Sequence, residues 1–514
     1  MTRYALGIDI GTTAVKACLI DDAGNLLAQT SAPHDLYSLE QGWAEEDPAD
    51  WWSGVVKCCQ DILAGKIVDP ALIKGVGVSG MVPAIVLVDV GGRVLRRSIQ
   101  QQDARATEEI DFLKARIDQD EIFKRTGSYT NQQHVLPRLM WVRKHEPQTW
   151  ERVCRIMGSY DYINWRLTGG QSLEANWAVE SGLFDIRSSD WIQEYLDIAG
   201  IEPDLFPPVR KPTEIIGCIT RTAARETGLV PGTPVVAGSA DHIASALSAG
   251  ISRPGDLLVK FGGGGDVLFC TGELKTHPRL YFDLHNIPGH YIINGCMAAS
   301  GSVVKWFCQN FVWGGGNDAT LQDLDREAAS VPPGSDGLIL LPYFLGEKTP
   351  LFDPLARGVM FGLSLHHTRA HIFRAILEAV SFGFRHHVDE LEAYGFFPER
   401  VFGTNGGSRS TLWQQITADV LGRPITYYPH HPGSALGVAF VAAMGTGLYD
   451  DWSQVSAFLG EGIRRDPDTA RHDVYDRAYA IYRDLYRHLK DDFVRLAGLY
   501  RAGEPGTGNL GTGV

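Results

Sequence analysis

The chain has 514 residues, of which 44% are hydrophobic and 21% are charged, with 57 glycines and a formal net charge of −14. Because a single hydrophobic core stops growing at about 250 to 300 residues, this length predicts two or three domains, and the composition excludes extended disorder outside the C-terminal tail. The negative charge disfavours nucleic-acid binding, which depends on clustered Lys and Arg to neutralise phosphates.

The cysteines and the apolar runs predict the compartment. The eight cysteines have neither the paired spacing of zinc ligands nor the density of a disulfide scaffold, so reduced thiols are expected. The N-terminus begins with a strand pattern, and the sequence has no apolar run of about 18 residues. We therefore expect a cytoplasmic protein that does not bind a membrane. The cysteines are Cys18, Cys58, Cys59, Cys154, Cys218, Cys270, Cys296 and Cys308.

The first 30 residues predict three consecutive strands joined by turns. Residues 4–10 are apolar and end at a Gly11-Thr12-Thr13 turn, and residues 15–21 and 26–30 continue the meander. In a Rossmann or P-loop protein the glycine turn opens directly into a helix, whereas here a second strand follows. This order disfavours a nucleotide-binding oxidoreductase.

Helices and strands alternate in the next part of the chain. Asp47 is a typical N-cap, with Pro48 at the first helical position. Residues 73–78 and 85–90 predict buried strands, and residues 103–118 and 137–155 predict helices.

Near residue 250 the opening pattern returns. Residues 256–261 form an apolar strand, the glycines at 262–265 a turn, and residues 267–270 another strand, which indicates an internal structural repeat. Turn formers cluster at 249–255, so we predict domains at 1–250 and 251–490. Residues 491–514 predict a flexible tail.

Residues 346–378 are the most informative segment of the chain. Apolar residues four apart predict a core helix after residue 368, but packing does not explain the polar loop that precedes it. Gly358-Val-Met-Phe-Gly362-Leu363, His371-Ile372 and Ala375-Ile-Leu-Glu378 reproduce the spaced signature of the FGGY carbohydrate kinases, which the chain resembles. The resemblance implies an α/β fold with two actin-like (ribonuclease H-like) ATPase lobes flanking a nucleotide and sugar cleft, and ATP and Mg²⁺ as cofactors.

Phosphoryl transfer requires backbone N–H groups for the phosphates, a carboxylate for the metal and a base. Gly11, Thr12 and Thr13 predict the phosphate turn, with Lys16 nearby, and Asp9 can face Mg²⁺ directly or through water. Without the resemblance, Asp9 is also explained as a turn former. Gly262, Gly263, Gly264 and Gly265 resemble the second phosphate turn of the family, although its usual pattern is Gly-Thr-Ser-Gly.

Two further segments resemble the family's binding motifs. Asn405, Gly406, Gly407 and Ser408 match its adenosine-binding turn, for which a plain strand-to-helix turn is the alternative. Asp241 follows a buried strand and opens a helix, so an N-cap is its alternative role. In the resembled kinases this aspartate accepts the proton of the attacking hydroxyl, and a helix N-terminus favours the ionised form that a base requires.

Sugar contacts are predicted by resemblance to the xylulose kinase branch of the family. The residues expected there are Gly80, Met81, Val82, Gln101, Gln102, Asp103, Asp241 and His242. Two positions depart from that branch, because Pro83 replaces a histidine and Gln101 replaces a tryptophan. The alternative to a sugar-binding role for residues 101–103 is a polar surface loop. The paired histidines at 366–367 and 386–387 lack the spacing of a metal site, and we assign them no function.

These features predict ATP-dependent phosphorylation of a primary hydroxyl of a small sugar, such as the ketopentose xylulose. Another ketose, a four- or five-carbon alditol or a deoxy sugar remains open as substrate. An actin-like ATP-binding chaperone or cytoskeletal protein is the alternative from another class. The expected partners are ATP and the sugar, and a homodimer is one of the oligomeric states left open.

Overall fold

The computed structural model describes residues 2–40, 42–313 and 319–501. The chain separates into two compact units. Unit 1 comprises residues 1–256, 269–293 and 431–461, and unit 2 comprises residues 257–268, 294–430 and 462–514. Within the described residues, none of the helices has both the length and the apolar character needed to cross a bilayer.

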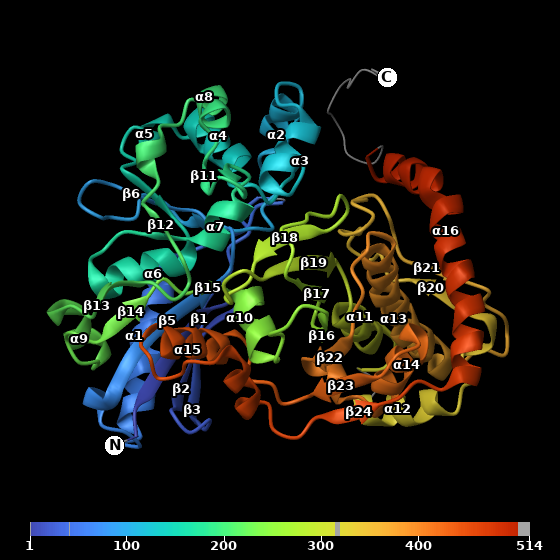
Figure 1. The fold of residues 1–514 in the computed structure, drawn as a ribbon. Helices are drawn as coiled ribbons and strands as arrows, with labels where there is room; N and C mark the ends of the chain where they lie inside the picture. Colours follow the sequence, from blue (N-terminus) through green and yellow to red (C-terminus); the bar gives the residue numbers. More distant parts are fainter. Residues whose placement is uncertain (1, 41, 314–318, 502–514) are drawn as a thin grey trace. The chain divides into compact units, whose positions relative to one another are not determined.

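The elements up to residue 248 alternate between strands and helices (Figure 1). They are β1 (Tyr4–Ile10), β2 (Ala14–Asp21), β3 (Leu26–Pro33), β4 (Glu45–Glu46), α1 (Pro48–Ala64), η1 (Pro70–Leu72), β5 (Ile73–Gly80), β6 (Val86–Val88), β7 (Ser98–Ile99), α2 (Thr107–Lys114), α3 (Gln119–Thr126), α4 (Val135–His145), α5 (Pro147–Trp150), β8 (Arg155–Met157), α6 (Ser159–Thr168), β9 (Leu173–Glu174), α7 (Ala175–Glu180), β10 (Phe184–Asp185), β11 (Asp190–Trp191), α8 (Gln193–Ala199), η2 (Pro203–Leu205), β12 (Val209–Arg210), β13 (Ile215–Cys218), α9 (Arg221–Thr227), β14 (Pro234–Val236), β15 (Ser239–Ala240) and α10 (Asp241–Ser248).

The remaining elements follow the repeated strand pattern. They are β16 (Asp256–Phe261), β17 (Gly265–Thr271), β18 (Tyr281–Leu284), β19 (Tyr291–Met297), α11 (Gly301–Phe311), α12 (Leu321–Ala329), η3 (Ser335–Gly337), β20 (Ile339–Leu341), β21 (Val359–Phe361), α13 (Arg369–Ala393), β22 (Arg400–Thr404), η4 (Gly406–Arg409), α14 (Thr411–Leu421), β23 (Ile425–Tyr428), α15 (Ser434–Gly445), η5 (Trp452–Phe458), β24 (Ile463–Arg465) and α16 (Thr469–Arg501).

The two large sheets repeat one strand order. In the first sheet β1 has β2 and then β3 on one side, and β5 and then β14 on the other. In the second sheet β16 has β17 and then β19 on one side, and β22 and then β23 on the other. The internal structural repeat predicted from the two glycine turns is therefore confirmed.

Helices α1 and α15 pack against opposite faces of the first sheet. Side chains alternate between the faces of a strand. Val15 of β2 meets Gly54 of α1, whereas Gly7 of β1 meets α15. A Cβ atom added to Gly7 would lie 2.0 Å from the carbonyl oxygen of Ala435, so the glycine allows the backbones to touch. Helix α15 therefore packs tightly against this face of the sheet.

Three predicted boundaries need correction. The helix expected at 103–118 begins at Thr107, because the Asp103 carboxylate accepts the N–H groups of Ala44 and Arg105 and keeps its own segment in a loop. The helix expected at 137–155 breaks at Pro147, which has no N–H to continue it. Gly265, expected in the second turn, is the first residue of β17.

The C-terminal helix extends beyond the predicted start of the tail. Helix α16 continues to Arg501, and Phe493 is buried at 4% exposure. A few regularly spaced apolar side chains are enough to pack a charged helix against the rest of the protein. Such a helix shows only weak hydrophobic periodicity in the sequence. The part of the predicted tail after residue 501 lies outside the described residues.

The contact between α10 and α15 predicts a large loss of stability for Gly437→Ala. A Cβ atom at Gly437 would lie 1.9 Å from the carbonyl oxygen of Ala244, and a backbone oxygen cannot rotate away. We expect the free energy of unfolding to fall by about 3 kcal/mol or more in a denaturant titration. Gly498→Ala is the matched control, because Gly498 lies in α16 with open space around it, and its substitution should change stability by less than about 1 kcal/mol. Equal stability of the two variants would contradict this packing.

Candidate active site

The Asp9 carboxylate lies near the end of β1 and is 4% exposed. Ser79 Oγ donates a hydrogen bond of 2.8 Å to Asp9 Oδ1, and the Ser434 side chain also bonds to this carboxyl group. Burial and the nearby charge of Asp241 raise the pKa of Asp9 to about 6, against the opposing effects of Ser434, Ser79 and Lys16. A nearby cation would therefore stabilise the ionised form of this buried carboxyl group.

Strand register brings Asp9 and Asp241 to one edge of the first sheet. Asp9 on β1 pairs with Ser79 on β5, and Ser79 pairs with Ser239 on β15, with both pairings parallel. Asp241 follows β15 directly. Ligand sites of open α/β sheets lie beyond the carboxyl ends of such strands. The two aspartates that the sequence predicts to cooperate therefore lie in one site of unit 1.

Asp241 is the first residue of α10, and the N-cap position belongs to Ala240. Asp241 Oδ1 accepts the N–H of His242 at 2.7 Å, and the Asp241 side chain keeps 34% exposure. The structure therefore does not place Asp241 at the N-cap, which was the alternative explanation for this residue. Its carboxylate remains accessible to a substrate.

The predicted phosphate turn of unit 1 is a tight loop between β1 and β2. The Gly11 N–H donates to the Ala14 carbonyl oxygen at 3.2 Å, and the His34 N–H donates to the Thr13 carbonyl oxygen at 3.1 Å. Lys16 is exposed and lies opposite Asp9 across the hairpin, and its charge acts to lower the pKa of Asp9.

Arg138 connects the two segments predicted to bind sugar. Its guanidinium is fully buried and donates to the carbonyl oxygens of Pro83 at 3.0 Å and Gln100 at 2.9 Å. Gly80, Met81 and Val82 lie beside the first contact, and Gln101, Gln102 and Asp103 follow the second. Met81 and Val82 are buried, whereas Gln102 is exposed. The structure thus places the two segments side by side in unit 1.

Asp103 is engaged within the protein. Its side chain is buried, and its oxygens accept the Ala44 N–H at 2.6 Å and two N–H groups of the Arg105 guanidinium at 2.7 and 2.8 Å. The Arg105 guanidinium in turn lies 3.8 Å over the ring of Trp43. This arrangement indicates that Asp103 supports the loop, so its predicted sugar contact remains only a prediction.

His242 faces three carboxyl groups. Its Nδ1 lies 3.5 Å from Asp241 Oδ1, and its Nε2 lies 3.3 Å from Asp283 Oδ2 and 3.9 Å from Glu180 Oε1. Burial lowers the pKa of His242, but the nearby carboxylates of Asp283, Asp241 and Glu180 outweigh it, so the pKa is raised well above its ordinary value. Burial and Asp283 raise the pKa of Glu180 well above its ordinary value.

The predicted nucleotide residues of unit 2 lie on two neighbouring strands. The glycine turn follows β16, and Asn405 follows β22, its neighbour in the second sheet. The N–H groups of Ser300 and Ser302 at the start of α11 donate to the Gly263 carbonyl oxygen at 2.8 and 3.0 Å. A Cβ atom on Gly262 would lie 3.8 Å from Asn405 Nδ2, so the two turns are adjacent. Gly406, Gly407 and Ser408 form the short helix η4 after Asn405.

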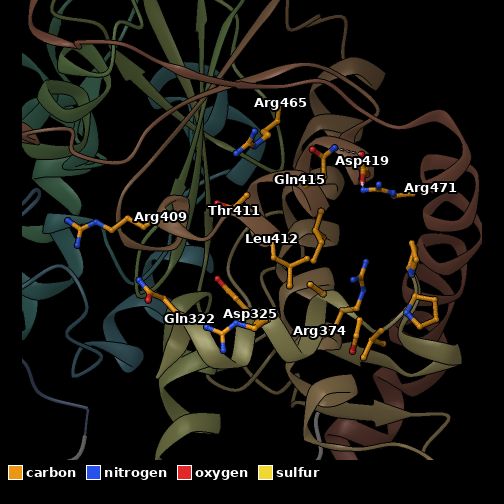
Figure 2. A pocket seen from close by; sticks show the side chains of 17 residues that line it. Gln322, Asp325, Arg374, Arg409, Thr411, Leu412, Gln415, Asp419, Arg465 and Arg471 are labelled. Atoms are coloured by element: carbon orange, nitrogen blue, oxygen red, sulfur yellow. Dashed lines mark hydrogen bonds and ion pairs between the residues drawn. The ribbon is translucent and has the colours of Figure 1, made fainter. Parts of the chain in front are cut away.

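A cavity of about 880 Å³ opens beside η4 in unit 2 (Figure 2). Arg409 and Thr411 border it next to the predicted adenosine-binding turn, and Leu412 contributes an apolar wall. Arg374 and Asp419 line the opposite part, and the Asp419 carboxylate lies 3.4 Å from the guanidinium of Arg471.

Several residues of the site were not predicted. Ser79 and Ser434 hold Asp9, Arg138 joins the two sugar segments, and Glu180 and Asp283 surround His242. They come from five separate parts of the chain, and their individual sequence contexts carry no motif. A buried arginine inside a helix with an apolar face was the one available signal, because such a charge requires partners.

Comparisons with known proteins identify the family of the chain. Residues 4–248 match the model of the N-terminal domain of the FGGY family of carbohydrate kinases, and residues 265–446 match that of its C-terminal domain. The chain is 30% identical to the L-xylulose/3-keto-L-gulonate kinase of Escherichia coli (strain K12) over 96% of this chain and 99% of the relative. It is 29% identical to the xylulose kinase of Staphylococcus epidermidis (strain ATCC 35984 / DSM 28319 / BCRC 17069 / CCUG 31568 / BM 3577 / RP62A) over 95% and 97% of the two chains.

A solved structure gives the same result for the fold. The xylulose kinase from Rhodospirillum rubrum is 44% identical, with a TM-score of 0.89 over 96% of this chain and 100% of that one. The expected fold of two actin-like lobes is confirmed. With both family models matched in order along most of its length, the chain belongs to the FGGY family of carbohydrate kinases.

Proposed function

We propose that this kinase phosphorylates a primary hydroxyl of a neutral ketopentose, with xylulose as the best candidate. The observation that carries the proposal is the placement of Asp9 and Asp241 at the ends of β1 and β15, two strands that both pair in parallel with β5. The substrate class rests on the names of the relatives, which include xylulose kinases from Staphylococcus epidermidis and Rhodospirillum rubrum. Residues 1–250 would bind the sugar and supply the first phosphate turn, and residues 251–490 would bind adenosine and supply the second phosphate turn.

Asp241 is proposed as the general base. Its carboxylate is accessible, lies at the start of a helix and belongs to the same site as Asp9. A base must reach the hydroxyl proton while the sugar is held in line with the phosphate. His242, beside Asp241, would orient the sugar, together with Gly80, Met81, Val82, Gln101 and Gln102.

Asp9 is proposed as the magnesium-side carboxylate. An oxygen donor suits Mg²⁺, and the raised pKa of Asp9 shows a buried carboxyl group without enough positive charge around it. Bound Mg²⁺ would neutralise charge on the phosphates. Gly11, Thr12, Thr13 and Lys16 would hold phosphate oxygens beside it.

The nucleotide residues of unit 2 are proposed to divide its recognition. Gly262, Gly263, Gly264 and Gly265 would approach the phosphates through their backbone, since the hydroxyl of the usual pattern is missing. Asn405, Gly406, Gly407 and Ser408 would contact adenosine. The cavity bordered by Arg409 and Leu412 would receive the adenine ring, because it offers an apolar wall next to that turn.

The charge of the site favours a neutral sugar over a sugar acid. Burial and the charge of Asp241 raise the pKa of Asp9, and burial and the charges of Asp283 and Asp241 raise the pKa of Glu180, so these carboxyl groups act on one another. A carboxylate substrate would add a like charge to this group.

A coupled assay of ADP release across sugars tests the substrate. We expect xylulose to give the highest kcat/KM, and gluconate to fall at least about a hundredfold below it because of like-charge repulsion. The panel should include other ketopentoses, four- and five-carbon alditols and deoxy sugars. A higher kcat/KM for gluconate than for xylulose would contradict the charge argument. A preference for an alditol would overturn only the assignment of a ketopentose as the substrate.

Asp241→Asn should abolish most turnover and leave nucleotide binding nearly intact. The amide keeps the shape of the side chain but accepts no proton, so we expect kcat to fall by about 10² to 10⁴-fold. Calorimetric titration with ADP checks that binding is retained. Asp450→Asn, an exposed aspartate of unit 1, is the matched control and should keep full activity. A kcat for Asp241→Asn near that of the wild type would refute the assignment.

The raised pKa of Asp9 predicts a pH-dependent affinity for Mg²⁺-ADP. Below a pH of about 6 Asp9 is protonated and neutral, so the affinity should weaken as the pH falls through this value and reach a plateau above it. The measurement is a calorimetric titration from pH 5 to pH 8. Asp9→Asn should bind more weakly and lose the step, and a step that persists in this variant would assign the ionisation to another group.

A further inference from the structure

Glu180, His242 and Asp283 form a compact cluster of three donor atoms in unit 1. One oxygen or nitrogen atom from each side chain lies within 4.8 Å of the other two. The side chains are 21%, 17% and 2% exposed, respectively. Glu180 Oε1, His242 Nε2 and Asp283 Oδ2 are all buried and lack a hydrogen-bond partner among the described residues. Buried donor atoms without such partners are rare in proteins and require an explanation.

Three separate elements hold this cluster. Glu180 ends α7, His242 is the second residue of α10, and Asp283 lies in β18. The side-chain amide of Asn176 bonds the backbone of Leu284 twice, accepting its N–H at 2.7 Å and donating to its carbonyl oxygen at 2.9 Å. These bonds attach α7 to β18, so the cluster is built by the fold and does not depend on flexible surface chains.

The spacing and chemistry of the donor atoms suit a metal ion. Bonds of about 2.0 to 2.2 Å around zinc or a similar ion place neighbouring donor atoms about 3 to 3.5 Å apart. The distances from Nε2 to Asp283 Oδ2 and Glu180 Oε1, 3.3 and 3.9 Å, come close to that range. One imidazole with two carboxylates is a donor set for zinc, manganese or cobalt, whereas Mg²⁺ prefers oxygen donors alone.

The second nitrogen of His242 is arranged as in metal-binding histidines. Nδ1 lies 3.5 Å from the Asp241 carboxylate, an acceptor for its N–H. Metal-bound histidines generally donate their other N–H to a carboxylate or a carbonyl, which sets the tautomer and leaves the opposite nitrogen for the metal.

We propose that Glu180, His242 and Asp283 bind a divalent transition-metal ion such as Zn²⁺, Mn²⁺ or Co²⁺, through Glu180 Oε1, His242 Nε2 and Asp283 Oδ2. This site is separate from the Mg²⁺ that accompanies ATP, and it does not rest on the identity of the sugar. Since Nδ1 of the same imidazole faces Asp241, the ion fixes the orientation of the ring beside this residue.

A second cluster of histidines provides a contrast. Asp336, His366 and His371 also lie within 4.8 Å of one another in unit 2, and Asp336 and His366 are exposed. Nδ1 of His371 accepts the Thr368 N–H at 3.1 Å, so the proton of a neutral His371 is on Nε2, which lies 3.2 Å from Asp336 Oδ2. This bonding uses both nitrogens of His371 and explains the cluster as a helix-end contact. It therefore serves as a control.

Metal binding should release protons. Glu180 and His242 must be deprotonated to bind a metal ion, so the ion competes with protons for these two ligands. Asp241, Asp283 and Glu174 are the other ionisable groups whose charges act on this pair. The affinity for the ion should therefore rise with pH.

Cobalt titration of chelator-treated, full-length enzyme, without ATP or sugar, tests the proposal. We expect the wild type to bind about one tight equivalent of Co²⁺, with a visible absorption spectrum of nitrogen and oxygen ligands. Asp283→Asn and Glu180→Gln should weaken binding by about a hundredfold, whereas His366→Ala should change it by less than about twofold. Titrations in two buffers of different ionisation enthalpy report the released protons.

Several results would overturn the site. They are a wild type that binds no Co²⁺ tightly, a thiolate charge-transfer band that assigns the ion to a cysteine, or tight binding lost in His366→Ala. Retained affinity in a folded Asp283→Asn variant, checked by circular dichroism, would do the same. The wild-type spectrum decides even if a variant fails to fold. Because sugar and ATP are absent, a wrong substrate assignment cannot produce or conceal any of these outcomes.

Discussion

The close approach of α15 to the first sheet is the contact on which the arrangement of the two candidate aspartates depends. Gly7 and Gly77 lack side chains where the helix crosses β1 and β5, so main chain lies directly against main chain. Gly437 allows the same helix to touch α10, the helix that begins with Asp241. The first residue of α15, Ser434, bonds Asp9. One helix thus determines the positions of both aspartates, through contacts that tolerate no added methyl group.

Electrostatics gives this site a second constraint. Carboxyl groups gather where the strands end, and burial makes their ionisation costly unless positive charge is close. Lys16 and His242 supply part of that charge within unit 1, and the raised pKa values of Asp9 and Glu180 show that it is incomplete. The proposed binding of a cation and a neutral sugar would suit such a deficit of positive charge. The same carboxyl groups would repel an anionic sugar.

Local sequence was sufficient to predict much of the fold. The similar patterns around Gly11 and Gly262 predicted the repeat, because a glycine turn between two apolar strands is typical of a β-hairpin. Asp47 and Pro48 predicted the start of α1 correctly. Boundaries that depend on a distant partner were wrong: the loop at Asp103 exists because its carboxylate bonds to Ala44, 59 residues away. Periodicity cannot report such a bond.

The sequence by itself determined the family, the repeated strand order and the two candidate aspartates, since these follow from motifs of a few neighbouring residues. Only the tertiary structure decided that Asp241 is not an N-cap, that Asp103 accepts the N–H of Ala44, and that Glu180 and Asp283 converge on His242. The physical reason is that burial and charge pairing arise between segments far apart in the chain, and their energies depend on distances that spacing along the sequence does not contain.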